Sequence, residues 1–414
     1  MFNDTLSYAT DDYNVTLILN RPFAPLEGLL AYTASSIVHP DSTPAEQMLD
    51  LGEDLVIGTG PFKLVRYIPN SDIKFNRWER YWRTGAYWDE IVYVYFRDGV
   101  TATNAINNLE VDYTDRCYGK TCPSNPEIIA TGDGVHEYIN GSIYWYLAFN
   151  NEIINRTWRK AISYAFNYTY LNEEIDDGTT ARARSLVPAS FPAHNKSVIA
   201  ADYNIPKARQ YMQKMGKGVG WELGTMNGDQ FTPGADEALW NAASFIPDVG
   251  NFTNNYWNIR HRQGSHFMEL FIQRLTEDLY HIGIDIVPQV LVWDQFIRLG
   301  EFDPDRLHLF YLGHGPDYFD PYVMIEPLVN PLSSENYARI NNTEINAVLT
   351  KAIIETDTDQ RIKYYKKLQY LIIDKYACHM PLEFDKLYYI HAKSLKGFPY
   401  NCMKSLYWYP TYRG

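Results

Sequence analysis

Strand-like and helix-like patterns alternate along the whole chain, and this alternation restricts the possible folds more than any other feature. Ile143–Phe149 is a short apolar run of the strand type, while Ser265–Ile282 carries an apolar stripe at helical spacing that ends before Gly283. The spacing predicts two further helices, over Thr343–Glu355 and Asp359–Lys375. We therefore expect an α/β fold in which helices are layered on sheets.

Further elements follow from local signals. Asn204 and Pro206 are an N-cap residue and an early proline, so they predict a helix that ends at Gly216. Strands are predicted for the alternating segment Asp12–Pro22 and for Leu387–Ala392 near the C-terminus.

Size and charge limit the classes of partner. With 414 residues the chain is long enough for two or three domains, and no run approaches the ~18 apolar residues of a membrane span. The net charge of −13 argues against binding to nucleic acid or to an anionic membrane surface. Aromatic residues make up 15% of the chain, which suits stacking surfaces for a ligand, although tyrosines that fill the core are the simpler explanation.

Motifs for the common enzyme chemistries are missing. The chain has no phosphate-binding loop, dinucleotide fingerprint, H-E-x-x-H, G-x-S-x-G or C-x-x-C motif. Asp317 and Asp320 could serve as a general acid and base, but no nucleophile lies near them in the sequence. We therefore expect a protein that is not an enzyme and that uses neither a cofactor nor a metal.

The stretch Leu307–Tyr322 holds the candidate site. An apolar strand leads into Gly313 and Gly315, where the absence of side chains lets a ligand approach the backbone. Asp317 follows, and its carboxylate could pair with a cation. An ordinary turn that closes a strand is the alternative interpretation, and Asp320-Pro321 is typical of such a turn.

Four cysteines allow two disulfides. The spacing predicts one small loop between Cys117 and Cys122 and a longer one between Cys378 and Cys402, with free thiols as the alternative. The C-x4-C spacing without a second pair makes a poor zinc site.

Several segments appear in a familiar order. They are GTGPFKLV from Gly58, RWERYW and YWDEIV after it, LAFNN, WRKAISYAFNYTYL, YNIPKARQYMQKMG, LTEDLYHIGIDI, GHGPDYFDP from Gly313, and LKGF from Leu395. Together, from about Asp11 to the C-terminus, they resemble the family 5 extracellular solute-binding proteins. This is the oligopeptide-, dipeptide- and nickel-binding class of ABC importers.

The resemblance implies a fold and a division into lobes. The fold is a two-lobed periplasmic-binding-protein-like α/β structure of class II, in the large peptide-binding type. Met1–Leu55 would be the remnant of a small N-terminal lobe. Val56–Ser142 with Leu387–Gly414 would form the first main lobe, and Ile143–Lys386 the second.

The resemblance also implies a function. The protein would be an extracytoplasmic monomer that binds peptides by hinge closure and delivers them to the permease subunits of an ABC importer. Asp317 matches the family position that takes the ligand's α-ammonium, and the backbone at Gly313 and Gly315 would pair with the peptide main chain. Tyr146 and Tyr389 (or its neighbour Tyr388) would line the cleft.

Departures from the family pattern leave alternatives open. His314 stands where the family usually has tryptophan, and Pro316 where alanine is usual. A metal chelate that His314 could contact is therefore an alternative ligand, and so is an oligosaccharide, on which the many Trp and Tyr rings could stack. Met1–Asn20 lacks the features of a signal peptide, and family members carry a long further segment ahead of Asp11. The resemblance therefore implies a truncated or split gene product or a misassigned start, with a non-functional fragment as a further alternative.

Overall fold

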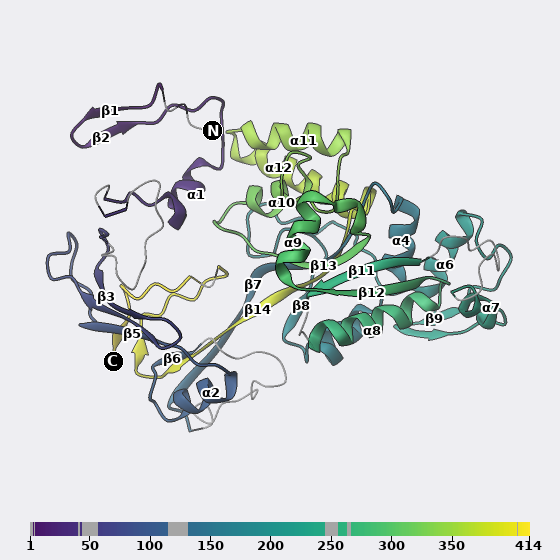
Figure 1. Cartoon of the computed structure of the whole chain (residues 1–414), viewed down its shortest axis with the longest axis horizontal. Coiled ribbons are helices and arrows are strands. Elements are labelled where there is room, and N and C mark those ends of the chain that lie inside the picture. The colour runs from purple at the N-terminus through teal and green to yellow at the C-terminus, as the bar shows by residue number, and fades with distance from the viewer. Residues whose placement is uncertain are drawn as a thin grey trace. The chain divides into compact units, whose positions relative to one another are not determined.

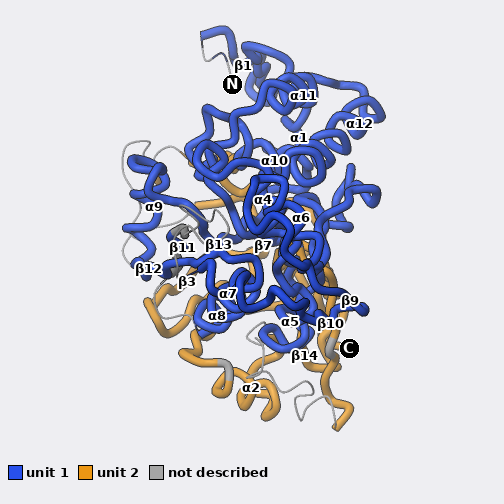
Figure 2. The backbone as a smooth tube through the Cα atoms, turned by 90° about the vertical axis from the view of Figure 1, so that its right-hand side faces the viewer, with its two compact units in different colours: residues 1–29, 142–385 blue, residues 30–141, 386–414 orange. Residues whose placement is uncertain are grey.

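The computed structural model describes residue 3 and residues 5–39, 42–43, 57–114, 131–244, 256–262, 266–403 and 405–414. The chain forms two compact units, coloured separately in Figure 2. Unit 1 holds Met1–Leu29 and Ser142–Asp385, and unit 2 holds Leu30–Gly141 and Lys386–Gly414. The three-part division into a remnant lobe and two main lobes stays a prediction.

Unit 1 is built on a mixed sheet with helices beside it (Figure 1). Its strand order is β12-β11-β13-β7-β14, and β8 also pairs with β14. The strands are β7 (Gly134–Phe149), β8 (Thr180–Arg182), β11 (Tyr256–Arg262), β12 (Asp285–Leu291), β13 (Leu309–His314) and β14 (His379–Ala392). β11 runs parallel to β12 and β13, whereas β13 and β7 are antiparallel. The predicted α/β layering is therefore confirmed.

The helices of unit 1 supply its main core. They are α4 (Arg156–Ala165), α5 (Tyr168–Tyr170), α6 (Ile205–Lys214), α7 (Glu237–Ala242), α8 (His266–Tyr280), α9 (Trp293–Phe302), α10 (Pro321–Val329), α11 (Thr343–Ile354) and α12 (Thr358–Gln369). Short π-helical segments follow α5 (η3, Leu171–Ile175) and α12 (η6, Tyr370–Lys375), and a single turn, η5 (Pro304–Arg306), precedes β13. None of the described helices combines the length and the apolar composition that a bilayer-crossing segment requires.

Helix α8 shows how the sequence pattern becomes packing. Its apolar stripe of Phe271, Leu275 and Leu279 is fully buried, and the helix lies beside β12 (Figure 1). Gly283 follows the helix with φ of +69°, a left-handed conformation that glycine adopts without steric cost. The helix predicted here is confirmed, and so is its stop signal.

Capping residues fix the starts of other helices. The Asn204 side chain accepts a hydrogen bond from the Lys207 backbone N at 2.8 Å and so caps α6 as predicted. Asn342 caps α11 and Asp357 caps α12 in the same way. The two predicted consecutive helices are therefore confirmed. The apolar stripe of α11 is buried, as are Tyr365 and Leu368 of α12.

Some boundaries differ from the predictions. The predicted strand Asp12–Pro22 is wrong in extent, because only Asn14–Thr16 (β2) forms a strand, paired with β1 (Tyr8–Asp11) in an exposed hairpin. The final strand begins at His379, well before the predicted start at Leu387. The prediction missed this first part because its residues are almost all buried and therefore carry no period-two pattern. Two short strands, β9 (Thr225–Asn227) and β10 (Gln230–Thr232), form a hairpin that was not predicted.

Unit 2 has much less buried apolar surface. It contains α2 (Gly99–Asn107), β6 (Tyr113–Thr114), the pair β15 (Leu395–Lys396) and β16 (Tyr412–Arg413), and the antiparallel sheet β3-β4-β5 (Phe62–Ile68, Asp72–Arg77, Glu90–Val94). Helix α1 (Leu26–Ala31) and the turn η1 (Thr33–Ser35) lie where the chain enters it. No residue of β3, β4 or β5 is fully buried. The unit therefore depends on a small core around Ile106 and Ile390.

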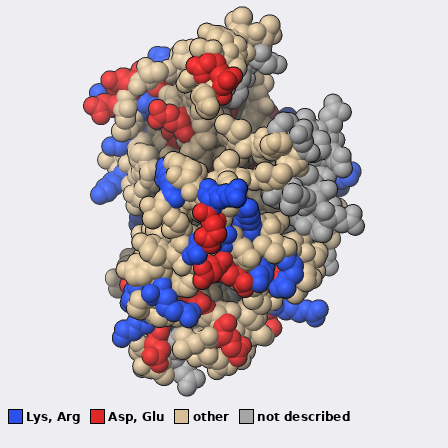
Figure 3. Space-filling model, turned by 90° about the vertical axis from the view of Figure 1, so that its left-hand side faces the viewer, with Lys and Arg blue, Asp and Glu red and all other residues tan. Residues whose placement is uncertain are grey.

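Charged side chains on the sheet of unit 2 form ion pairs. Arg66 pairs with Asp72 at 2.6 Å and Lys74 with Glu90 at 2.5 Å. On the face of the molecule drawn in Figure 3, acidic and basic groups adjoin each other. Pairs as exposed as these contribute little to stability.

The predicted disulfide between Cys378 and Cys402 is wrong, because the two residues are not joined. Cys378 precedes β14 in the core of unit 1, where burial raises the pKa of its thiol to about 12, and Cys402 belongs to unit 2. A buried thiol of this kind behaves as a small apolar side chain. The predicted pair Cys117–Cys122 lies outside the described residues.

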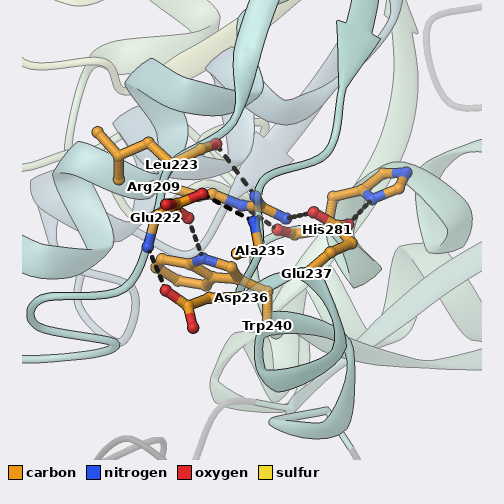
Figure 4. A network of polar contacts seen from close by, with 8 residues as sticks. All are labelled: Arg209, Glu222, Leu223, Ala235, Asp236, Glu237, Trp240 and His281. Atoms are coloured by element: carbon orange, nitrogen blue, oxygen red, sulfur yellow. Dashed lines mark hydrogen bonds and ion pairs between the residues drawn. The ribbon is translucent and has the colours of Figure 1, made fainter.

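A buried arginine ties α6 to α7 and to the end of α8 (Figure 4). The Arg209 guanidinium donates to the carbonyl oxygens of His281 and Leu223 at 2.7 and 3.0 Å and pairs with Glu237 at 2.6 Å. Glu237 also accepts a bond from His281 at 2.7 Å. Burial opposes ionisation of Glu237, but the bonds from His281 and Arg209 prevail and lower its pKa. The network therefore holds a charged carboxylate in place.

Replacing this buried arginine should destabilise unit 1. In Arg209→Met the Glu237 carboxylate keeps only its bond from His281, and two backbone carbonyls lose the arginine donor. We therefore expect a loss of about 3 kcal/mol in the free energy of unfolding. Arg184→Met is the matched control, because Arg184 pairs with Asp202 at an exposed site, and its expected loss is below about 1 kcal/mol. Urea denaturation measures both, and equal losses would contradict the role of the network.

Candidate functional site

The candidate site begins at the end of β13, where the described residues pair with the strand on one side. All six residues of β13 have register partners on β7, from Leu309 opposite Phe149 to His314 opposite Tyr144. On the other side, β11 pairs only with Leu309 and Phe310. The last residues of β13 therefore have a register partner on β7 alone among the described residues.

Gly313 lies on this part of the strand, directly opposite Trp145. A Cβ atom at position 313 would come within 2.5 Å of the Trp145 ring, which stacks on Tyr311 with ring centroids 5.4 Å apart. At Gly315 the nearest atom to an added Cβ would be the Ile143 Cγ1, at an ordinary 3.5 Å. A close side chain thus requires glycine at position 313, for a reason that the sequence did not reveal. No such contact requires glycine at position 315.

His314 points into the interior of unit 1. Its side chain is 9% exposed, and Nε2 donates a hydrogen bond to the Val323 carbonyl oxygen at 2.7 Å. Its Nδ1 lies 3.7 Å from a carboxylate oxygen of Glu335. The predicted ligand contact through His314 is untested, but Nε2 is already occupied by a partner within the protein.

Asp317 and Asp320 have different environments although they share one loop. Asp317 is exposed, and its side chain has no hydrogen bond or ion pair with any residue that the structure describes. Asp320 is nearly buried, pairs with Arg361 and caps α10 by accepting a bond from the Tyr322 backbone N at 2.8 Å. The predicted turn at Asp320-Pro321 is therefore wrong, since these residues start a helix, with proline in its first turn.

The two candidate tyrosines are buried. Tyr146 is 2% exposed and stacks on Tyr144 and His379, with ring centroids 4.9 and 4.5 Å away. Burial raises the pKa of Tyr146 and lowers that of His379 to about 3, so both rings are neutral. Tyr389 belongs to unit 2 and donates its hydroxyl to the Asn401 carbonyl oxygen at 2.7 Å. Their contact with ligand stays a prediction.

Within unit 1, four predicted residues lie at one site: Gly313 and His314 at the end of β13, and Gly315 and Asp317 in the loop that follows. Tyr146 lies on the neighbouring strand, opposite Leu312.

A pair of buried carboxyl groups behind β13 was not predicted. Glu383 on β14 hydrogen-bonds with Asp176 and accepts bonds from the hydroxyls of Thr180 at 2.9 Å and Tyr311 at 3.4 Å. Burial raises the pKa of both carboxyl groups, and the neighbouring Asp176 raises that of Glu383 further. The pair therefore holds its protons to a higher pH than ordinary carboxyl groups do. No spacing pattern could have indicated two acids so far apart in the sequence.

A family comparison decides the identity of the chain. The model described as "Bacterial extracellular solute-binding proteins, family 5 Middle" matches residues 4–336. The chain belongs to this family. The family predicted from the order of the sequence segments is confirmed.

Relatives of this family 5 protein differ in what they bind. The dipeptide-binding protein of Escherichia coli is 25% identical over 379 residues, which cover 88% of this chain and 63% of that protein. Heme-binding protein A of Haemophilus influenzae is 24% identical over 378 residues, which cover 87% of this chain and 61% of that protein. The chain thus spans less than two thirds of the length of either relative.

Solved structures share the fold. The dipeptide-binding protein from Pseudoalteromonas sp. SM9913 in complex with Met-Leu matches with a TM-score of 0.72 at 20% identity, covering 99% of this chain and 75% of that one. The predicted periplasmic-binding-protein-like fold of the family 5 protein is thereby confirmed.

The two glycines at the end of β13 should respond differently to substitution. Gly313→Ala forces the Trp145 ring away from its stacked position on Tyr311, so we expect a loss of about 1–3 kcal/mol in the free energy of unfolding. Gly315→Ala makes only an ordinary contact and should change stability by less than about 0.5 kcal/mol. Urea denaturation tests this, and equal effects would show that the ring does not set the requirement.

The carboxyl pair should make stability depend on pH. Because the pKa of Glu383 is raised in the folded state, its contribution to stability is present below the unfolded pKa and is lost as pH rises through the folded pKa. Wild type should therefore lose stability as the pH rises above the ordinary carboxyl range, whereas Glu383→Gln, which keeps an acceptor for Thr180, should lose less. Urea unfolding at a series of pH values measures the difference, and parallel pH profiles would contradict it.

Proposed function

We propose that this family 5 protein is the substrate-binding component of an ABC importer and that it binds peptides, with the Asp317 carboxylate accepting the ligand's α-ammonium group. The exposed position of Asp317 carries this proposal. It lies just past the end of β13 and has no partner among the described residues, whereas Asp320 three residues later is already neutralised by Arg361. A fixed carboxylate without a cation is the chemistry that an ammonium group requires.

The edge of β13 supports the same ligand class. Beyond Phe310 this strand has register partners on β7 but none on β11 among the described residues, so the backbone up to Gly313 offers a place where an extended peptide could pair as an added strand. Main-chain hydrogen bonds of this kind give affinity without distinguishing between the side chains of different peptides. Peptides with different side chains would therefore bind.

The remaining features of the proposal follow from family membership. The protein would act outside the cytoplasm as a monomer, would close around its ligand by a hinge motion, and would deliver the ligand to the permease subunits of the importer. It would not catalyse a reaction and would not bind nucleic acid. Family 5 proteins are described as extracellular and solute-binding, which supports the location and the absence of catalysis.

A metal chelate such as heme is the second candidate ligand. It is favoured by the likeness to heme-binding protein A. Direct ligation by His314 has little support, since its Nε2 donates to the Val323 carbonyl. A chelate would therefore have to be held by other groups, and its binding would not depend on Asp317. An oligosaccharide would likewise bind without an ammonium anchor.

Removing the proposed anchor should weaken binding of peptides with a free amine. In Asp317→Asn the charge-assisted pair is lost, so we expect the Kd for Met-Leu to rise at least about 30-fold, and N-acetyl-Met-Leu to bind wild type and variant equally weakly. Asp305→Asn is the control, because it removes one charge from another exposed position before β13. Isothermal titration calorimetry measures each Kd.

Two outcomes would overturn the proposal. Equal affinity of wild type for Met-Leu and its acetylated form would show that no amine is anchored. An unchanged Kd in Asp317→Asn would show that Asp317 is not the anchor. Binding of heme that survives Asp317→Asn would favour the second candidate.

A further inference from the structure

The loop between β13 and α10, residues Gly315–Asp320, has contacts at both ends and in its middle, while Asp317 has no partner among the residues that the structure describes. We refer to it as the β13–α10 loop. Its attachments come from parts of unit 1 that are far apart in the sequence. Each attachment bears on where the Asp317 carboxylate lies.

His314 secures the entrance of the loop. Its Nε2 bond of 2.7 Å to the Val323 carbonyl oxygen joins the last residue of β13 to the first turn of α10. The bond therefore spans the loop and fixes the separation of its two ends. Because the ring is 9% exposed, water has little access to replace this donor.

Arg361 secures the exit. From α12 its guanidinium binds both carboxylate oxygens of Asp320, at 2.8 and 2.6 Å. Each of the two side chains is 14% exposed. A bidentate ion pair of this kind fixes the orientation of the carboxylate as well as its distance from the guanidinium. The same carboxylate caps α10, so Arg361 locks the residue at which the loop becomes a helix.

Aromatic side chains secure the middle. The Tyr318 ring packs so closely on Gly28 of α1 that a Cβ atom there would come within 2.8 Å of it. Phe319 contacts Phe191, with ring centroids 4.5 Å apart. Both residues that follow Asp317 therefore have contacts of their own.

We propose that His314 and Arg361 are positioning residues for ligand binding. They hold the β13–α10 loop so that the Asp317 carboxylate faces solvent at a fixed place before the ligand arrives. This rests on the proposed function, since it assigns to Asp317 the role of amine anchor. A carboxylate on a fixed loop loses less conformational freedom on binding than one on a loose loop, so affinity for the amine is higher.

The test uses the ratio of Kd for N-acetyl-Met-Leu to Kd for Met-Leu, measured by calorimetry on the full chain. This ratio reports the amine anchor and cancels general effects on binding. We expect this ratio to fall about five-fold in Arg361→Gln. In Arg361→Lys it should recover in part, because lysine keeps the charge but cannot make the bidentate contact with Asp320. Arg184→Gln, at an exposed ion pair, should leave the ratio unchanged.

His314 is tested in the same way. His314→Gln retains an N–H that can reach the Val323 carbonyl and should keep most of the ratio. His314→Leu removes the donor and should lower the ratio about five-fold. Equal ratios in these two variants, with both folded by circular dichroism, would overturn the role of His314.

A double-mutant cycle separates positioning from a purely structural effect. If Arg361 acts through Asp317, then Arg361→Gln in an Asp317→Asn background should lower Met-Leu affinity no further. Additive losses would overturn the inference. Should Asp317→Asn itself leave the ratio unchanged, the proposed function fails. If Asp317→Asn removes the preference for the free amine while both Arg361 variants keep the wild-type ratio, only the inference about Arg361 fails.

Discussion

The antiparallel pairing of β13 with β7 is the interaction on which the rest of the candidate site depends. Six consecutive register pairs place Gly313 under the Trp145 ring and His314 opposite Tyr144. Because side chains alternate between the two faces of a strand, a shift by one residue would expose His314 and bury Gly313 on the wrong side. The bond from His314 to α10 would then be lost. The loop that carries Asp317 would lose the contact that fixes its ends.

Several buried polar groups of unit 1 have specific partners. Glu383 hydrogen-bonds with Asp176 behind Tyr311, Arg361 is neutralised by Asp320, and Arg209 by Glu237. A buried charge or polar group is costly unless it is paired, so these contacts restrict unit 1 to one arrangement more strictly than apolar packing would. Asp317 differs from these groups because it is exposed and has no partner among the described residues.

The sequence was informative where the signal is local. The stripe and the glycine stop of α8, the Asn204 cap of α6 and the paired helices α11 and α12 all depend on neighbours within a few residues, and all were predicted correctly. The order of short segments was sufficient to predict the family, which the comparison confirmed.

Features that depend on distant residues could not be predicted. The reason for Gly313 is a ring on another strand, the partner of Asp320 lies on α12, and Asp176 meets Glu383 only in the folded chain. Helix α10 was missed because Asp-Pro starts both turns and helices, and only the bond from Tyr322 to Asp320 distinguishes the two. The free thiol at Cys378 follows from its depth in the core, which a cysteine count does not reveal.

The unequal burial of the two units has a consequence for β7 and β14, each of which has residues in both. In unit 1 these strands contribute fully buried side chains such as Leu147, Phe149 and Leu382 to a large core, whereas β3, β4 and β5 of unit 2 have no fully buried residue. Opening a segment costs less where fewer apolar contacts are broken. Amide hydrogens of β7 should therefore exchange with solvent along a gradient, slowest inside unit 1 and faster around the exposed Glu137 and Tyr138 of unit 2. β14 should show a weaker gradient, because Tyr389 and Ile390 keep it buried in unit 2.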